Sequence, residues 1–429
     1  MHGKSIMNNT LKKVVYWYSP HKDMRFLNDR SLLLEKDIMV IASVIFNIET
    51  AFRMGHIIDE VEIPISSHTA YLCDINKIKQ ELEALLRFVL IYPIEIRFNI
   101  NSNIKYKRDK ELNFEICKNV CLFSGGIDSF AGIIKTKVER GKVAGIFITH
   151  SDQPRGVNII MKLQKEVLSK ENIPLYILHA PPMKRYGYSQ LRGFLYCLYG
   201  SIYLNLLKAE NLFVTECGPT MYQSKFSPFD SVTMTTHPYV LEKTKTIIEI
   251  LLKRKINIII PFENLTKSEV FMTSPKKEYF QYTNSCISLG TGRNCGHCYG
   301  CIVRKIGSIV AGITEAKYDS DPFIQDYIKA DNLISLARFS YDILVNYSSM
   351  NFTSKENIFV YKKQRLFRRF ALDTFAAIYI LKEMGKNTNP HIERLYATTI
   401  NKIGQKEIQE RIKQVRNGRF VPNFDKMVK

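Results

Sequence analysis

Apolar and polar positions alternate along three segments in the first 112 residues of the chain. Such alternation is typical of strands with one buried face, and it occurs at residues 12–19, 61–67 and 92–100. Residues 75–91 instead carry apolar side chains at helical spacing. A polar, charged link follows at residues 101–113. We therefore expect an α+β N-terminal domain over residues 1–112.

The pattern changes over residues 113–315, where short β-rich runs alternate with longer helical segments. The runs lie at residues 120–123, 144–149, 174–179, 212–216 and 256–261. Helical periodicity is clear at residues 156–172 and 191–211. Strands that alternate with helices form βαβ units, and the resulting parallel sheet is covered on both faces. We predict an α/β domain of this kind.

Residues 316–429 are predicted to be mostly helical. Residues 326–346 and 372–386 are amphipathic. The last part, residues 406–429, is basic. The pattern therefore predicts a helical, basic C-terminal extension.

Composition places the chain among folded globular proteins. It has 429 residues, 45% hydrophobic and 24% charged, so a large core can form. The formal net charge of +20 favours a polyanionic partner such as nucleic acid, or an anionic substrate. Biased Lys, Ile and Asn usage is the alternative explanation, favoured because the spacings of known nucleic-acid-binding motifs are absent. Basic residues 365–369 and 411–419 either bind a partner or nucleic acid, or form a solvated helical face, and both interpretations stay open.

Location and redox state follow from what the chain lacks. No window approaches the about 18 consecutive apolar residues of a membrane span, and the first residues lack the apolar core of a signal peptide. We expect a cytoplasmic protein without a membrane partner. Its nine cysteines are then not expected to form disulfides.

A glycine pair stands where the run at residues 120–123 gives way to a helical segment. Gly125 and Gly126 allow positive φ and close approach of a ligand, so that consecutive amides form an anion nest. The following helix adds its positive end. The motif thus predicts a phosphate site formed by Ser124, Gly125, Gly126, Ile127, Asp128 and Ser129. Within such a site, Asp128 either caps the helix or holds Mg²⁺. The alternative to a phosphate site is a plain Gly-Gly turn between strand and helix, with Asp128 as a cap.

This motif is neither a Walker A sequence nor a dinucleotide fingerprint. "SGGIDS" after a buried strand resembles the PP-loop of the N-type ATP pyrophosphatases. The resemblance implies an adenine nucleotide alpha hydrolase-like fold, with a parallel sheet that binds adenine at the carboxyl ends of its strands. It also implies cleavage of ATP between the α and β phosphates and adenylation of an acceptor group.

Four cysteines crowd into one short segment: Cys286, Cys295, Cys298 and Cys301. This spacing is typical of a tetrahedral Cys₄ zinc knuckle that orders a loop beside the site. An iron–sulfur cluster or four reduced thiols are the alternatives. His297 lies between the ligands and could substitute for one. Arg293, Arg304 and Lys305 are expected to offset the thiolate charge.

The two motifs together resemble the 7-cyano-7-deazaguanine synthase family, QueC. Like that family, the chain has SGGxDS followed by Cys-x8-Cys-x2-Cys-x2-Cys and then Arg304, over residues 115–315. The resemblance implies ATP, Mg²⁺ and Zn²⁺ as cofactors and a 7-deazaguanine-type carboxylate as substrate.

Departures from the family indicate a particular branch. His150, Ser151 and Asp152 stand where the family has its aspartate-tyrosine-glycine-glutamine segment, and Gln190 and Arg192 replace an arginine step. With residues 216–245 and the terminal additions, the chain resembles the QueC-like proteins of anti-phage operons, QatC of the Qat system and the component of type IV CBASS. That branch implies an amide link between a deazaguanine and the amino terminus of a partner protein from the same operon. A nitrile-forming synthase in queuosine or archaeosine biosynthesis and a non-catalytic nucleic-acid-binding component are the alternatives.

Further candidates follow the predicted strands. Glu216 and Gly218 would line the nucleotide site, or form a polar strand exit. His237 would bind phosphate or accept a proton, or occupy a turn. Lys267 would neutralise charge on the adenylate or pyrophosphate, while Thr266 and Glu269 form a capping box. Residues of the loop after Gly218 could contact the base or acceptor: Tyr222, Gln223, Lys225 and Asp230.

Overall fold

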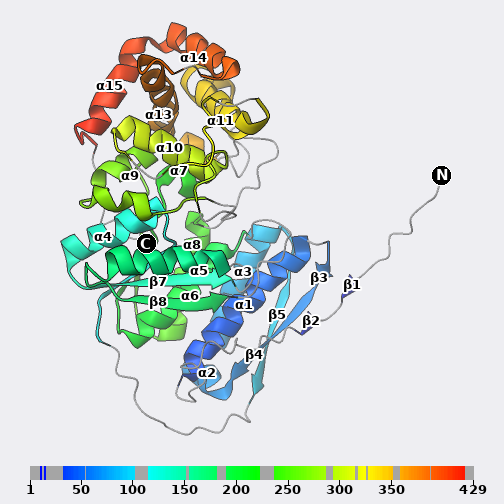
Figure 1. Ribbon diagram of the computed structural model, residues 1–429. Coiled ribbons are helices and arrows are strands. Elements are labelled where there is room, and N and C mark those ends of the chain that lie inside the picture. The colour runs from blue at the N-terminus through cyan, green and yellow to red at the C-terminus, as the bar shows by residue number, and fades with distance from the viewer. Residues whose placement is uncertain are drawn as a thin grey trace, which may run out of the picture.

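A computed structural model shows the chain as a central sheet with a helical lobe at one end and a smaller α/β lobe beside it (Figure 1). The described residues are 10–11, 14–15, 32–53, 55–101, 115–150, 154–180, 190–222, 236–286, 293–314, 317–324, 327–350, 358–386 and 388–420.

The central sheet has five parallel strands in the order β10-β9-β6-β7-β8. They are β6 (Asn119–Leu122), β7 (Val143–His150), β8 (Leu175–Ala180), β9 (Asn211–Phe213) and β10 (Asn257–Ile259). The predicted parallel sheet is therefore confirmed. β9 is shorter than predicted and ends at Phe213, so Glu216 lies in the loop that follows it.

The order of the strands reverses between β6 and β9. The chain runs outward from β6 through β7 to β8, and then returns to place β9 on the other side of β6. In open parallel sheets, ligands bind at the carboxyl ends of the strands where such a reversal separates the two loops. The loops after β6 and β9 therefore border the expected ligand site.

Helices cover both faces of this sheet. α4 (Ile127–Arg140) and α5 (Pro154–Leu163), which continues through η2 (Gln164–Leu168), pack on one face. α6 (Arg192–Leu206) and α8 (Pro238–Leu252) lie on the other. On α4, a Cβ at Gly132 would come within 2.2 Å of Thr215 Cγ2, so glycine is required for this close packing.

The N-terminal lobe is itself built from alternating strands and helices. Its strands pair in parallel, β1 (Thr10–Leu11) with β3 (Ile57–Ile58), and β2 (Val14–Val15) with β4 (Glu60–Ser66) and β5 (Glu95–Asn101). Its helices are α1 (Leu33–Arg53), α2 (Ser67–Leu72) and α3 (Ile75–Leu90). The expected α+β arrangement is thus corrected to α/β, because helical crossovers bring each strand back in the same direction. α1 is absent from the elements predicted above.

Two helices join this lobe to the central domain. α1 packs on α6 and α3 packs on α8, so helices lie between the small and the central sheet. Ile38, Ile41 and Ile45 are among the many buried apolar residues of α1. Across the joint, the hydroxyls of Ser43 and Tyr199 lie 2.9 Å apart.

The predicted helical extension is confirmed for its described residues. It contains α11 (Tyr327–Val345), η4 (Tyr347–Ser349), α12 (Ile358–Lys362), α13 (Gln364–Glu383), α14 (Pro390–Ile403) and α15 (Gln405–Arg416). The preceding elements α7 (Gly218–Met221), α9 (Lys267–Thr273), η3 (Lys277–Tyr282) and α10 (Tyr299–Ala311) connect the sheet to it. α13 and α15 pack on α10, and α15 also contacts α9, so packing is continuous across residue 315. Among the helices in these ranges, none has the length and apolarity to cross a membrane.

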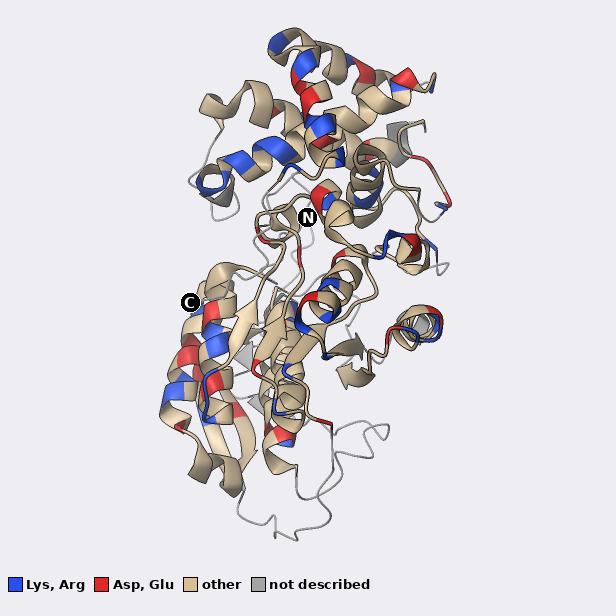
Figure 2. Cartoon of the chain, turned by 90° about the vertical axis from the view of Figure 1, so that its left-hand side faces the viewer, with Lys and Arg blue, Asp and Glu red and all other residues tan. Residues whose placement is uncertain are grey.

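The positive charge is dispersed over the molecule. Figure 2 shows Lys and Arg interspersed with Asp and Glu on helices at both ends. Within the predicted basic segments, Arg369 pairs with Glu269, and Arg411, whose side chain is 1% exposed, pairs with Glu269 and Asp373. These two arginines therefore form internal ion pairs, and a role of the remaining basic residues in binding a partner stays a prediction.

Candidate functional site

The glycine turn, residues 124–129, links β6 to α4 at the reversal of the sheet. Gly125 has φ +77°, the conformation that favours glycine. The hydroxyl oxygens of Ser124 and Ser129 lie 3.1 Å apart, and Ser129 donates to the Gly126 carbonyl at 3.1 Å. The turn thus has the positive φ and the paired hydroxyls expected of an anion site.

No side-chain cap is present at the N-terminus of α4 among the residues that the structure describes. Gly126 is the N-cap residue and makes no side-chain cap hydrogen bond, while Asp128 lies inside the first turn. The alternative that Asp128 caps the helix is therefore wrong. The first amides of α4 and the helix dipole are available to an anion.

Asp128 bridges the two loops of the switch point. Its side chain is buried, and Oδ2 accepts hydrogen bonds from Lys267 Nζ at 2.5 Å and from the Cys217 amide at 3.3 Å. Its Oδ1 is buried and has no hydrogen-bond partner among the described residues. An orphaned carboxylate oxygen is costly unless a cation or a donor binds it, so this atom fits a hard cation such as Mg²⁺.

Lys267 reaches Asp128 from the first turn of α9. The predicted capping box is confirmed: the Thr266 side chain accepts from the third helical amide, and Glu269 accepts from the Thr266 amide at 2.9 Å. Across from Lys267, a Cβ at Gly307 would lie 2.8 Å from Lys267 Cγ. Burial by itself lowers the pKa of Lys267, but the combined effect of Asp128, Cys217 and Glu216 outweighs burial and raises that pKa. Lys267 is therefore a cation held at the switch point.

Glu216 and Cys217 follow β9 beside this ion pair. Burial, and then the charge of Asp128, raises the pKa of Glu216, while Lys267 and Arg192 act in the opposite direction. Burial, with a smaller effect of Asp128, raises the pKa of the Cys217 thiol to about 12. The site thus places one cation, Lys267, beside two carboxyl groups, those of Asp128 and Glu216. Arg192 extends the positive field toward the start of α6.

Gly218 has a packing role at the start of α7. A Cβ there would lie 2.2 Å from the Glu263 carbonyl oxygen, and its amide donates to the Leu265 carbonyl at 3.0 Å. Tyr222 donates to the Glu263 carboxylate. These contacts account for both residues structurally, and a role in ligand binding stays a prediction.

His237 is the N-cap of α8. Its Nδ1 accepts from the Tyr239 amide at 3.1 Å, and its ring lies 4.9 Å from that of Phe88 on α3. The cap explains the residue without chemistry, and a catalytic role stays a prediction.

His150 ends β7, where the N-terminal lobe approaches the same edge of the sheet. Its Nε2 lies 3.0 Å from Tyr196 Oη, and its ring stacks on Phe46 of α1 at 5.6 Å. The backbone amide of Gln190 donates to the carboxylate of Glu49 on α1 at 3.2 Å. The N-terminal lobe therefore contributes to this edge. Several other candidates lie outside the described residues: Ser151, Asp152, Gln223, Lys225 and Asp230.

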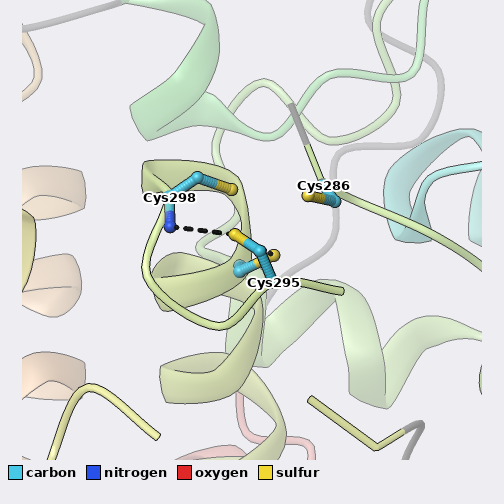
Figure 3. Close-up of side chains that lie close together, drawn as sticks. Cys286, Cys295 and Cys298 are labelled. Carbon is cyan, nitrogen blue, oxygen red and sulfur yellow. Dashed lines mark hydrogen bonds between the residues drawn. The ribbon is translucent and has the colours of Figure 1, made fainter. Parts of the chain in front are cut away.

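The four predicted cysteine ligands come together. The Sγ atoms of Cys286, Cys295, Cys298 and Cys301 all lie within 4.8 Å of one another. Figure 3 shows Cys286 approaching from a separate segment, opposite the turn that carries Cys295 and Cys298 into α10. Four thiolates at this separation fit a tetrahedral zinc ion and leave no open position for chemistry.

His297 is outside this ligand set, since its Nδ1 lies 3.4 Å from Ser320 Oγ. Lys305 pairs with Asp321 at 2.6 Å. The buried Arg304 donates to the carbonyls of Thr283 and Phe280 at 2.9 and 3.0 Å. These contacts of Lys305 and Arg304 are therefore structural.

The cysteine cluster is connected to the glycine turn. The backbone amide of Asn284 donates to the Gly125 carbonyl at 2.9 Å, and the backbone amide of Cys286 donates to Asn284 Oδ1 at 2.7 Å. A metal bound at Cys286 therefore orders a segment that contacts the turn directly.

These features define a class of protein: a parallel α/β domain with a glycine turn at its switch point and a separate Cys₄ cluster that could hold zinc. Comparison with known families narrows the class. Residues 229–312 match the family model of the queuosine biosynthesis protein QueC. No curated protein sequence matches the chain.

The matched segment contains Lys267 and all four cysteines, while the glycine turn precedes it. The match supports a QueC-like family. A QueC-like domain indicates a PP-loop fold and an ATP-using, synthase-like activity.

Several residues around the site escaped prediction from sequence. Cys217 supplies a backbone donor, Asn284 contacts the glycine turn, and Asp373 and Arg411 approach the Lys267 turn from the extension. Proximity of Asn284 to Cys286 was the only available signal. The others act through contacts between distant segments, which no local pattern reveals.

Proposed function

We propose that this chain uses ATP to adenylate a 7-deazaguanine carboxylate and then forms an amide, modifying the amino terminus of a partner protein in an anti-phage system. The observation that carries the proposal is the meeting, at the switch point, of an uncapped helix N-terminus, Asp128 and Lys267.

Each residue of the site would have a different role in such a reaction. The amides of the glycine turn would bind the β and γ phosphates. Asp128 Oδ1 would hold Mg²⁺, which neutralises phosphate charge when bound. Lys267 would stabilise the charge that develops on departing pyrophosphate.

The chemistry has two balanced steps. A carboxylate oxygen attacks the α-phosphorus, the bond from that phosphorus to the bridging oxygen breaks, and pyrophosphate leaves. An amine nitrogen then attacks the acyl carbon, loses a proton and displaces AMP. Closed thiolate coordination at the Cys₄ cluster fits a structural metal outside these steps.

The first test is product analysis. The protein is incubated with ATP, magnesium and 7-carboxy-7-deazaguanine, and pyrophosphate and AMP are measured. We expect Asp128→Asn to lower the rate at least about 100-fold, as loss of a charge-stabilising group does. Glu139→Gln, an exposed acid on the same helix, is the matched control and should not change it. Absence of pyrophosphate from the wild type would contradict the proposal.

The second test identifies the acceptor. The chain, or its Asp128→Asn variant, is co-expressed with the proteins of its operon, and their intact masses are determined. A mass gain at an amino terminus that requires Asp128 supports amide formation on a protein.

A nitrile-forming synthase is the second candidate, and the QueC match favours it. Release of a nitrile when ammonia is the only acceptor, with no protein adduct, would decide for this candidate. A nucleic-acid-binding role has less support, because the described basic residues are interspersed with acids (Figure 2). Salt-sensitive DNA binding without AMP formation would indicate that role.

A further inference from the structure

We propose that the C-terminal extension supplies a positioning residue, Arg411, that sets the direction of Lys267 in the site. The kinetic part of this inference rests on the proposed function, whereas the geometric part does not. Arg411 lies on α15, and its charge is enclosed by residues of α9 and α13.

Arg411 contacts both ends of the turn that carries Lys267. Its Nη2 donates to Thr266 Oγ1 at 3.1 Å, and its Nη1 lies 2.9 Å from Glu269 Oε1. Thr266 and Glu269 are the two members of the capping box, and Lys267 is the residue between them that faces Asp128. Arg411 thus holds the frame from which the Lys267 side chain extends.

A second layer fixes Arg411 itself. Asp373 on α13 accepts from Arg411 Nε at 2.8 Å through Oδ1 and from the Ser268 hydroxyl at 2.6 Å through Oδ2. Arg369 donates to Glu269 at 2.9 Å from the same helix. All four residues of the turn, 266–269, are therefore in contact with this network or with Asp128.

The network is buried, so its hydrogen bonds hold the turn at residues 266–269 in one arrangement. Arg411 and Asp373 are 1% and 2% exposed and Glu269 is fully buried, so water cannot replace a lost partner. Guanidinium–carboxylate pairs have strict geometry. A buried pair stabilises little compared with an apolar contact, and its better-attested role is to specify one arrangement.

Lys267 also has little freedom on its other side. Gly307 of α10 leaves just enough space for the Lys267 stem, since an added Cβ would lie 2.8 Å from Cγ and 3.1 Å from its carbonyl carbon. The side chain therefore passes between α10 and the turn. A small shift of the turn would move Nζ away from Asp128.

The experiment compares four variants with the wild type. Arg411→Met removes the charge, Arg411→Lys retains it, and Gly307→Ala displaces Lys267 directly. Arg368→Ala is the matched control, because Arg368 pairs with Glu407 between the same two helices but is 44% exposed.

Two measurements are made on each variant, at a temperature where circular dichroism shows it folded. The first is acetylation of Lys267 by acetic anhydride without nucleotide, quantified by peptide mass spectrometry. The second is pyrophosphate release, resolved into kcat and KM for ATP.

We expect Arg411→Met and Gly307→Ala to raise Lys267 acetylation severalfold. Arg411→Met should lower kcat about tenfold, with KM for ATP within a factor of two, because the lost contact acts in the transition state. Arg411→Lys should recover part of both effects, and Arg368→Ala should match the wild type.

Unchanged acetylation and kcat in folded Arg411→Met would overturn the inference, because a merely structural role predicts that result. If Arg411→Met does not fold, Asp373→Asn, which loosens Arg411 without removing it, replaces it with the same criteria. If the wild type releases no pyrophosphate, the proposed function fails, and acetylation alone decides the inference.

Discussion

The N-terminal lobe and the C-terminal extension bury carboxylates in opposite ways. In the N-terminal lobe, Glu35 accepts from the Asn205 amide at 2.7 Å and Asp37 accepts from the Ser66 hydroxyl at 2.5 Å. Burial raises the pKa of both acids, and these neutral donors offset it only in part. In the extension, Asp373 meets the guanidinium of Arg411 instead.

This difference indicates how the N-terminal lobe and the C-terminal extension each respond to the loss of a charged group. An acid with neutral donors can take up a proton and remain buried, so the N-terminal lobe is not committed to an ion pair. A buried arginine cannot lose its proton and requires its partners. The extension is therefore expected to be far more sensitive to loss of one charge.

The largest effect is expected for Glu269→Gln. Glutamine still accepts from the Thr266 amide, so the capping box remains, but Arg411 and Arg369 lose their shared carboxylate. We expect the free energy of unfolding to fall by about 3–5 kcal/mol, measured by urea denaturation. Arg368→Ala is the control, and its exposed pair should contribute about 0–1 kcal/mol. Equal losses in the two variants would contradict the comparison.

A smaller effect is expected for Cys301→Ser, which removes one ligand of the cysteine cluster. We expect loss of one equivalent of zinc by elemental analysis and about 1–3 kcal/mol of stability. Hydrogen exchange should increase in α10 and near Asn284, which contacts the glycine turn, while α1 and α3 keep their protection. Increased exchange over α1 would show that the lobes respond as one unit.

Ser43→Ala tests the neutral joint between α1 and α6. It removes the hydrogen bond between the Ser43 and Tyr199 hydroxyls, and we expect a loss of about 1 kcal/mol, the net value of such a hydrogen bond. A Tyr199→Phe, Ser43→Ala double variant should lose less than the sum of the two single variants, because both single variants remove the same hydrogen bond. A loss as large as that of Glu269→Gln would remove the distinction between the two regions.

The smallest effect is a pH dependence. Since the pKa of Glu35 is raised from the ordinary value of 4.5, the folded state holds a proton that the unfolded state has released. The contribution of Glu35 to stability therefore falls as pH rises from 4.5 through the raised pKa. Glu35→Gln should abolish this part of the slope, seen as urea midpoints that converge at acidic pH. His68 and Asp37 lie near enough to alter the window. Parallel curves for the two proteins would contradict the assignment.

Short-range patterns predicted the central domain well. Each strand of the sheet lies within two residues of a predicted run, apart from the shorter β9 and β10, because buried parallel strands are continuous apolar runs. The cysteine cluster and the capping box at Thr266 could also be predicted, because the residues that form each of them lie close together in the sequence. The functional role of each site residue, including metal binding by the cysteines, stays a prediction.

The remaining features depend on distant contacts. α1 has apolar residues around most of its surface because it packs between a sheet and α6, so its pattern lacks the polar face that marks an amphipathic helix. Asp128 looked like a helix cap, yet its carboxylate turns to Lys267, 139 residues further along the chain. The local sequence allowed either a helix cap or a Mg²⁺ ligand. The structure excludes the cap, and Mg²⁺ binding stays a prediction.

The sequence by itself determined the parallel α/β order, the glycine turn and the cysteine cluster, because each depends on neighbours within a few residues. Only the tertiary structure decided that the parallel strands of the N-terminal lobe form an α/β unit, and that a basic helix of the extension buries Arg411 behind Lys267. The physical reason is that charge and hydrophobicity of a residue do not say which buried partner it will meet. That depends on how segments more than a hundred residues apart pack together.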